Sequence, residues 1–205
     1  MARTTQKRNV SRQSQSTEGA TIYQFKIMLA GSDPPIWRRI QMEDCTLADL
    51  HYCIQGAMGW ENSHLHEFNI EGQHYAAPPP FFAGPMDSDA GDATTVWLGQ
   101  LIDAGKKFRC GYLYDFGDSW EHLIEFETMC KPESKARYPR CVDGERACPP
   151  DDCGGIWGFY DFVAAMADRK HPEHQDLKEW YGRLFKPDAF DKKMATRQMR
   201  EWTHE

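Results

Sequence analysis

The amino-acid sequence predicts an α+β fold, with an antiparallel or mixed sheet, an aromatic hairpin, one early helix and a helical C-terminal third. Apolar and polar residues alternate in several segments before residue 130, as in strands, whereas apolar residues follow helical spacing after residue 155. With 40% hydrophobic and 13% aromatic residues, a chain of 205 residues can bury a substantial core. We therefore expect a single α+β domain over residues 21–205.

The first third of the domain contains two predicted strands. Residues 23–29 and 36–42 alternate in polarity and are separated by a turn rich in glycine and proline. Side chains alternate between the two faces of a strand, so Trp37 and Arg39 should share one face and Arg38 should lie on the other.

An early helix should begin at Thr46, where a weak capping box with Asp49 is available, and should end at Gly59. A further strand is predicted over residues 65–70. Residues 76–93 are rich in proline, glycine, alanine and aspartate, which predicts a long exposed loop.

The hairpin is the clearest local pattern. Residues 108–116 and 120–126 alternate cleanly and are joined by Gly117-Asp118-Ser119, which predicts two antiparallel strands. A cysteine-containing loop should follow over residues 130–155. Helical spacing then predicts three helices, at 156–166, around 177–184 and from Pro187 onward.

The net charge of −7 is unevenly distributed along the chain. Residues 1–20 lack apolar periodicity and are rich in serine, threonine and glutamine, so we expect a disordered basic tail there. The remaining body is acidic and should repel phosphate backbones, which argues against nucleic acid as its partner. The charged residues of the tail are Arg3, Lys7, Arg8, Arg12 and Glu18.

The expected compartment is the cytoplasm. The sequence has no apolar run near the ~20 residues of a membrane span and no apolar stretch typical of a secretory signal. Seven cysteines are an odd number, so we expect free thiols or metal ligands rather than a disulfide framework.

The cysteine loop is the main candidate metal site. Cys141, Cys148 and Cys153 could bind zinc as thiolates, with His122 of the hairpin as the fourth ligand. The short C-x-x-C spacing of zinc knuckles is missing. The alternative is ordinary free thiols in a tight loop, with His122 a core histidine bonded to Asp115 or to a backbone carbonyl.

Carboxylates form a second candidate set. Asp115 and Asp118 flank the hairpin turn and Asp151 and Asp152 lie in the cysteine loop, so together they could bind a hard cation or supply a general base. Asp beside glycine commonly bonds its own backbone, which is the structural alternative. Asp152 is also a candidate N-cap for the helix after Gly154-Gly155.

Other side chains could contact a ligand. His64 and His66 would point the same way on a strand and could chelate a metal, or they could lie on a partly packed edge. Arg39 beside Trp37 could bind an anionic group or form a structural ion pair with the acidic hairpin. An aromatic cleft or ordinary core packing would account for Trp60 and Trp120.

Four motifs occur in a fixed order along the chain: Pro-Pro-Ile-Trp-Arg-Arg at 34–39, Gly-Trp followed by His-Leu-His-Glu-Phe within 59–68, Tyr-Asp-Phe-Gly-Asp-Ser-Trp-Glu-His at 114–122, and Cys-Pro-Pro-Asp-Asp-Cys-Gly-Gly at 148–155. Together they resemble the plasmid Ri ORF-3-like family, also described as insertion-sequence passenger proteins, over residues 23–190. The resemblance implies an α+β fold and an association with plasmids or mobile elements. The family loop commonly reads Pro-Pro-Glu-Asp, so Asp151 is one methylene shorter here.

Three functions are compatible with these patterns. The first is a non-enzymatic binding or accessory module for a protein or small-molecule partner, with a zinc site in the cysteine loop. The second is a metal-dependent hydrolase that uses the Cys, His and Asp cluster. The third is a nucleic-acid-binding accessory protein that acts through the basic tail. No arrangement resembling a serine or tyrosine recombinase is present, although some relatives carry a resolvase-like label.

Overall fold

The computed structural model describes residues 21–77, 89–102 and 108–203. The predicted tail over 1–20 and most of the predicted loop over 76–93 lie outside the described residues. Within the described chain, no helix is both long and apolar enough to cross a membrane.

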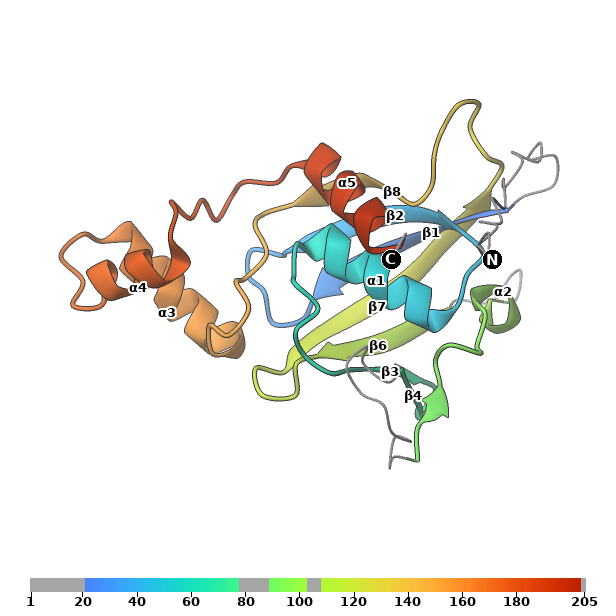
Figure 1. The fold of residues 1–205 in the computed structure, drawn as a ribbon, viewed down its shortest axis with the longest axis horizontal. Helices are drawn as coiled ribbons and strands as arrows, with labels where there is room; N and C mark the ends of the chain where they lie inside the picture. Colours follow the sequence, from blue (N-terminus) through green and yellow to red (C-terminus); the bar gives the residue numbers. More distant parts are fainter. Residues whose placement is uncertain (1–20, 78–88, 103–107, 204–205) are drawn as a thin grey trace, which may run out of the picture.

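The described residues form one mixed sheet and five helices, which confirms the predicted α+β class (Figure 1). The strand order is β5-β4-β3-β6-β7-β1-β2-β8, with antiparallel neighbours except for the parallel pair β4 and β5. The strands are β1 (Ile22–Leu29), β2 (Trp37–Glu43), β3 (His66–Ile70), β4 (Gln73–Ala76), β5 (Gly91–Asp92), β6 (Arg109–Tyr114), β7 (Trp120–Cys130) and β8 (Arg140–Glu145). The helices are α1 (Leu47–Met58), α2 (Leu98–Leu101), α3 (Gly155–Ala167), α4 (His174–Tyr181) and α5 (Lys192–Trp202).

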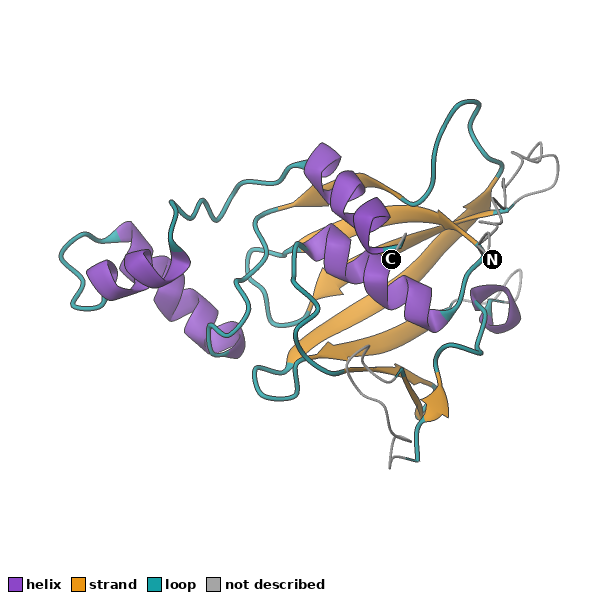
Figure 2. Cartoon of the chain, viewed as in Figure 1, coloured by secondary structure: helices purple, strands orange, loops and turns teal. Residues whose placement is uncertain are grey.

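Two helices cover one face of the sheet. Figure 2 shows α1 and α5 lying over the strands, while α3 and α4 project beyond the end of the sheet. The capping box at Thr46 and Asp49 starts α1, and Gly59, with φ of 98°, ends it, both as predicted. At the contact between α1 and α5, a Cβ on Gly56 would lie 2.4 Å from the backbone nitrogen of Met199, so only glycine allows this close approach.

The structure corrects the sequence prediction at several places. The predicted loop over 76–93 includes β5, a two-residue strand that pairs with β4 and is too short to be recognised from alternation. The predicted cysteine loop contains β8, an edge strand that pairs with β2. The sequence pattern did not predict this strand, because apolar and polar residues do not alternate along residues 140–145. The last helix begins at Lys192 rather than near Pro187, because the carboxylate of Asp191 accepts hydrogen bonds from the Lys193 and Met194 amides and caps it there.

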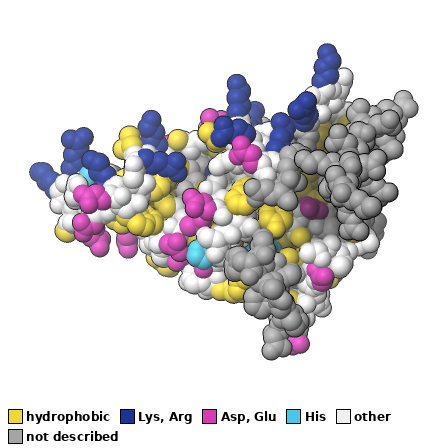
Figure 3. All heavy atoms as spheres, viewed as in Figure 1, with side chains coloured by type: hydrophobic (Ala, Val, Ile, Leu, Met, Phe, Trp, Pro, Cys, Tyr) yellow, Lys and Arg dark blue, Asp and Glu magenta, His cyan; other side chains and the backbone are white. Residues whose placement is uncertain are grey.

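Helix α5 closes the edge of the sheet at β8. Thr196 Oγ1 accepts a hydrogen bond from the Cys141 amide at 3.0 Å and lies 3.3 Å from the Cys141 carbonyl. The Arg200 Nε donates to the Pro139 carbonyl at 3.0 Å. Side chains of α5 thus occupy backbone groups that an exposed edge strand would offer to another chain. Figure 3 shows Lys and Arg side chains gathered along this edge of the molecule.

Arg38 is a buried cation, only 2% exposed, on the core side of β2. It lies on the face opposite to Trp37 and Arg39, as the strand pattern predicted, but the pattern did not indicate its burial. Its guanidinium donates to four backbone carbonyls at 2.8 to 2.9 Å and lies 4.3 Å from the ring centroid of Phe190. Burial lowers the pKa of Arg38, but an arginine in a protein remains charged. The four carbonyls belong to Trp37, Ala57, Glu145 and Arg146.

Histidines line the space between α1 and the sheet. His51 stacks on His66 with ring centroids 3.5 Å apart, and its Nδ1 lies 2.8 Å from the Tyr112 hydroxyl. His122 is 3% exposed, and its Nδ1 donates to the Tyr112 carbonyl at 3.3 Å. Burial lowers the pKa of His51 and His122 to about 4, so both rings are neutral at pH 7.

We expect Arg38→Met to destabilise the fold by about 3 kcal/mol or more, because it leaves several buried carbonyls without a donor. Arg39→Met is the matched control. Arg39 pairs with the carboxylates of Glu127 and Asp143 on the solvent-facing side of the sheet, where an ion pair contributes about 0–1 kcal/mol. Urea unfolding of both variants measures the difference. Equal losses would show that the four carbonyl contacts carry no special weight.

A second prediction concerns acid unfolding. The folded-state pKa of His122 is lowered from 6.5 to about 4, so its contribution to stability is present above pH 6.5 and is lost as the pH falls toward 4. In His122→Phe, the drop in unfolding free energy between pH 7 and pH 4.5 should shrink by about 2–3 kcal/mol. His74→Phe, at an exposed position, should leave the drop unchanged. A wild-type slope in His122→Phe would contradict the neutral, buried state of this ring.

Candidate functional site

Three connections meet beyond the end of the β6–β7 hairpin. They are the segment between α1 and β3, the turn between β6 and β7, and the segment between β8 and α3. Trp60 Nε1 donates to the Pro149 carbonyl at 3.1 Å, the Glu61 amide donates to Asp151 Oδ2 at 3.2 Å, and the Gly154 amide donates to Asp118 Oδ2 at 3.0 Å. These bonds fasten the three connections to one another.

Each connection contributes one side chain to a compact group, which we call the His64–Asp115–Asp152 site. His64 Nε2 lies 3.6 Å from Asp115 Oδ2 and 3.2 Å from Asp152 Oδ1. One ligand atom from each residue lies within 4.8 Å of the other two. Across residues 21–77, 89–102 and 108–203, this is the one group of three or more His, Cys, Asp or Glu side chains that meets this criterion.

The contacts of His64 lack hydrogen-bond geometry. Its Nε2 is buried and has no hydrogen-bond partner in the described structure, although two carboxylate oxygens lie nearby. Asp115 is 8% exposed, and its other oxygen accepts a hydrogen bond from the Gly117 amide at 2.9 Å, the local turn bond that the sequence suggested as an alternative. Asp115 Oδ2 is thereby aimed by the turn.

Backbone strain is concentrated in the same connections. Asn62, Asp115, Ser119 and Asp152 all have φ between 53° and 59°, a left-handed conformation that side chains with a Cβ adopt at a cost. Two of these residues, Asp115 and Asp152, belong to the site. The prediction of Asp152 as an N-cap is wrong: Gly154 is the N-cap of α3, because the left-handed Asp152 is two residues too early.

Gly155 explains how the third connection packs against the hairpin. A Cβ at this position would lie 2.5 Å from the Asp118 carbonyl oxygen, and its φ is 69°. Glycine therefore permits the backbone of the loop to contact the hairpin turn directly. Asp118 itself acts as a structural acceptor for the Gly154 amide rather than as a member of the His64–Asp115–Asp152 site.

An aromatic layer lies beneath the site. Tyr114 contacts His64 edge-on, with ring centroids 5.7 Å apart, and packs against Trp60 at 4.9 Å. Trp60 in turn contacts Trp120 and His122, with centroid distances of 6.1 and 5.1 Å. Trp60 and Trp120 are only 3% and 1% exposed, so both side chains pack in the core, which is the second of the two roles expected from the sequence.

Unpartnered polar atoms surround this layer. Among the described residues, five buried side-chain atoms have no hydrogen-bond partner: His64 Nε2 in the site, Trp120 Nε1 and His122 Nε2 in the aromatic layer, Asp151 Oδ1 in the β8–α3 connection, and His66 Nε2 in the core beside His51. Burial raises the pKa of Asp151 to about 6, because the charged carboxylate loses hydration. Native proteins leave few such atoms unpaired, and three of the five lie in the site or in the aromatic layer beneath it.

The predicted thiol site is not assembled in the described structure. Cys141 lies in β8, where its thiol contacts the Asp143 carbonyl at 3.3 Å, and it forms no group with Cys148, Cys153 and His122. Burial raises the pKa of the Cys141 thiol to about 11 and that of Cys153 to about 12, and it also raises the pKa of Cys148. His122 has the alternative role, a core histidine bonded to a backbone carbonyl.

His64 and His66, which are two residues apart, have separate partners. His64 precedes β3 in a bend and joins Asp115 and Asp152, whereas His66, the first residue of β3, stacks on His51 in the core. The sequence pattern grouped Asp115 and Asp152 in one carboxylate set, but it paired His64 with His66 and did not bring His64 to the carboxylates. The only sequence signal for their meeting was the order of the motifs that carry them.

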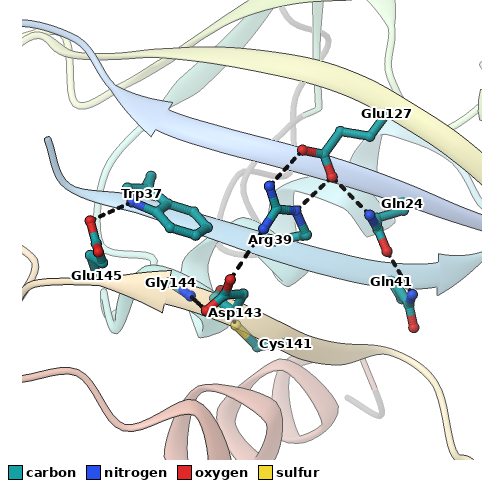
Figure 4. Close-up of polar contacts among 9 residues, drawn as sticks. All are labelled: Gln24, Trp37, Arg39, Gln41, Glu127, Cys141, Asp143, Gly144 and Glu145. Carbon is teal, nitrogen blue, oxygen red and sulfur yellow. Dashed lines mark hydrogen bonds and ion pairs between the residues drawn. The ribbon is translucent and has the colours of Figure 1, made fainter.

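Arg39 and Trp37 lie on the opposite, solvent-facing side of the sheet (Figure 4). The Arg39 guanidinium contacts Glu127 through Nε at 2.7 Å and Nη2 at 2.9 Å, and Asp143 through Nη1 at 3.2 Å. Trp37 Nε1 donates to Glu145 at 2.9 Å. Arg39 therefore has the structural ion pair with the hairpin strand that the sequence suggested as an alternative to anion binding.

Comparisons with known proteins agree with the ordered motifs. Residues 21–194 match the family described as plasmid pRiA4b ORF-3-like protein. The uncharacterized protein y4hQ of Sinorhizobium fredii is 36% identical over 166 residues, which cover 80% of this chain and 82% of that protein. A crystal structure of a protein of unknown function, MM3350 from Methanosarcina mazei Go1, superposes with a TM-score of 0.75 at 33% identity, covering 85% of this chain and 97% of the other. The chain thus belongs to the plasmid pRiA4b ORF-3-like family.

Proposed function

We propose that the protein is a non-enzymatic binding module of the cytoplasm, associated with plasmids or mobile elements, in which a divalent cation at the His64–Asp115–Asp152 site fastens the three connections around it. The observation that carries the proposal is the meeting of one imidazole and two carboxylates from three separate segments within 4.8 Å. A bound cation would offset the repulsion between the two carboxylates and the strain of their backbone.

Zinc is the ion that we propose. Two ligand atoms about 2.0–2.1 Å from zinc in a tetrahedral arrangement lie about 3.3–3.4 Å apart. The distances from His64 Nε2 to the two carboxylate oxygens, 3.2 and 3.6 Å, bracket this value. Zinc accepts mixed nitrogen and oxygen ligands, and an ion among the three donors would also satisfy the unpartnered His64 Nε2.

The zinc ligands that we propose are the imidazole and carboxylates of the site, in place of the thiols expected from the sequence. Zinc binds cysteine as thiolate, and the raised pKa values of Cys141 and Cys153 oppose ionisation of those thiols. The cation site keeps a link with the cysteine loop, because Asp152 precedes Cys153 directly. The loop therefore participates through its carboxylate.

One observation favours a hydrolase as a second candidate function. The Asp152 side chain is 68% exposed, so one side of the site is open to solvent. Three protein ligands with an open position can hold a metal-bound water, as catalytic zinc sites do. Zinc-dependent hydrolysis of p-nitrophenyl phosphate or acetate, abolished in His64→Gln, would place the protein in this class instead.

We expect the wild-type protein, purified without added metal, to bind one zinc ion per chain. His64→Gln, Asp115→Asn and Asp152→Asn should each weaken zinc binding by about 100-fold or more, because each removes a direct ligand. Zinc should raise the melting temperature of the wild-type protein, since it binds only the folded state, and should have little effect in these variants. Competitive titration with a chromophoric chelator and thermal unfolding measure both effects.

Two sets of variants provide the controls. His74→Gln and Asp161→Asn change the same residue types at exposed positions and should bind zinc normally. Cys148→Ser combined with Cys153→Ser tests the thiols. Zinc lost in the double cysteine variant but retained in His64→Gln would contradict our assignment, and a wild-type protein that neither holds zinc nor gains stability from it would overturn the proposal.

A further inference from the structure

A second candidate surface lies at the β8 edge of the sheet, where α5 packs against β8. A hollow of about 590 Å³ runs along this contact. Cys141 and Thr196 contribute to its lining, and Lys192, Lys193, Arg197 and Arg200 provide its cations. Glu201 is the one acidic side chain in the lining. The surface is independent of the His64–Asp115–Asp152 site.

The charge of this surface opposes that of the protein. The whole chain carries −7, yet α5 presents four cations and one carboxylate. Within the described residues, the one ion pair of these cations joins Arg197 to Glu201 at 3.2 Å, with both side chains largely exposed. Such a pair contributes little and exchanges readily for another anion.

The cationic surface continues onto the connection between β7 and β8. Lys131, Lys135 and Arg137 are exposed there, and Arg200 of α5 donates to the backbone carbonyl of Arg137 at 2.5 Å. Figure 3 shows Lys and Arg side chains along the upper side of this view, from the α3–α4 end to the region of α5, with some Asp and Glu side chains among them. We call the cations of α5 together with those of this connection, where Glu133 is also exposed and pairs with Arg140, the α5 basic edge.

We propose that the α5 basic edge binds the phosphate backbone of nucleic acid. From Lys192 to Arg200 the helix rises about 12 Å, at about 1.5 Å per residue. The rise per nucleotide along one strand is about 3.4 Å, so this part of the edge spans three to four phosphates. A basic stripe along one helix is the electrostatic pattern of such a surface.

The lining favours phosphates over an acidic protein. Protein interfaces concentrate aromatic anchors at their centre and are depleted in lysine. The hollow contains no aromatic side chain among its described lining residues, and lysines form part of its rim. Backbone recognition by charge requires no such anchor, so the surface is suited to contacts that do not read the base sequence.

Fluorescence anisotropy of the full chain with labelled 20-nucleotide single-stranded DNA and a 20-base-pair duplex tests the proposal between 50 and 300 mM salt. In the triple variant Lys192→Gln, Lys193→Gln, Arg197→Gln, affinity should fall at least about 10-fold at low salt. The slope of log K against log salt should become less steep by about 2–3, because three phosphate contacts are lost. Arg200 is left in place, because it bonds the backbone of the β7–β8 connection.

Two further variants separate this surface from the other cations. Lys170→Gln, Lys178→Gln, Arg183→Gln removes three cations near α4 and should bind as the wild type does. Arg3→Gln, Lys7→Gln, Arg8→Gln, Arg12→Gln removes those of the N-terminal segment and should retain most of the binding. Circular dichroism verifies that each variant is folded.

Several outcomes would overturn the proposal. These are the absence of DNA binding by the wild type at 50 mM salt, an equal loss in the α4 variant, or a loss confined to the N-terminal variant. Tighter binding of labelled poly-glutamate than of either DNA would assign the edge to an acidic protein instead.

Discussion

The buried guanidinium of Arg38 is the interaction on which the rest of the structure depends. It joins β2 to the Ala57 carbonyl, at the end of α1, and to the carbonyls of Glu145 and Arg146, at the end of β8. These are the points where two of the three site connections leave the regular structure. A cation bonded to carbonyls on several elements is charged, desolvated and directional, so its loss would release both connections together.

The His64–Asp115–Asp152 site is positioned by the aromatic layer and by the bonds between the three connections, rather than by hydrogen bonds between its own side chains. In the hairpin turn, the Gly117 amide donates a hydrogen bond to the Asp115 carboxylate. Trp60 donates to the Pro149 carbonyl and so fixes the β8–α3 connection. Left-handed residues at Asp115 and Asp152 can persist only where the surrounding contacts determine the backbone. Left-handed backbone and buried nitrogens without a hydrogen-bond partner therefore occur together at this end of the hairpin.

Local patterns in the sequence predicted most of the fold but only the members of the site. Alternation and capping chemistry placed β1, β2, α1 and the hairpin, because these signals act between near neighbours. Strand β8 was missed because an edge strand bonded to α5 lacks a clear two-residue period. The meeting of His64 with Asp115 and Asp152 depends on three long-range loop contacts, which leave no spacing to be recognised along the chain.

Net charge describes the chain as a whole and not its separate surfaces. The expectation that an acidic body disfavours nucleic acid stays a prediction, and it treats the charge as uniform. In the fold, Asp115 and Asp152 lie together at one place, and four cations of α5 line another. At physiological salt, screening over about 8 Å makes each surface act largely by itself. The acidic face would then repel a polyanion and restrict it to the α5 basic edge, while the same carboxylates attract a divalent cation. Both proposals thus rest on the sign of each surface and not on the net charge of the chain.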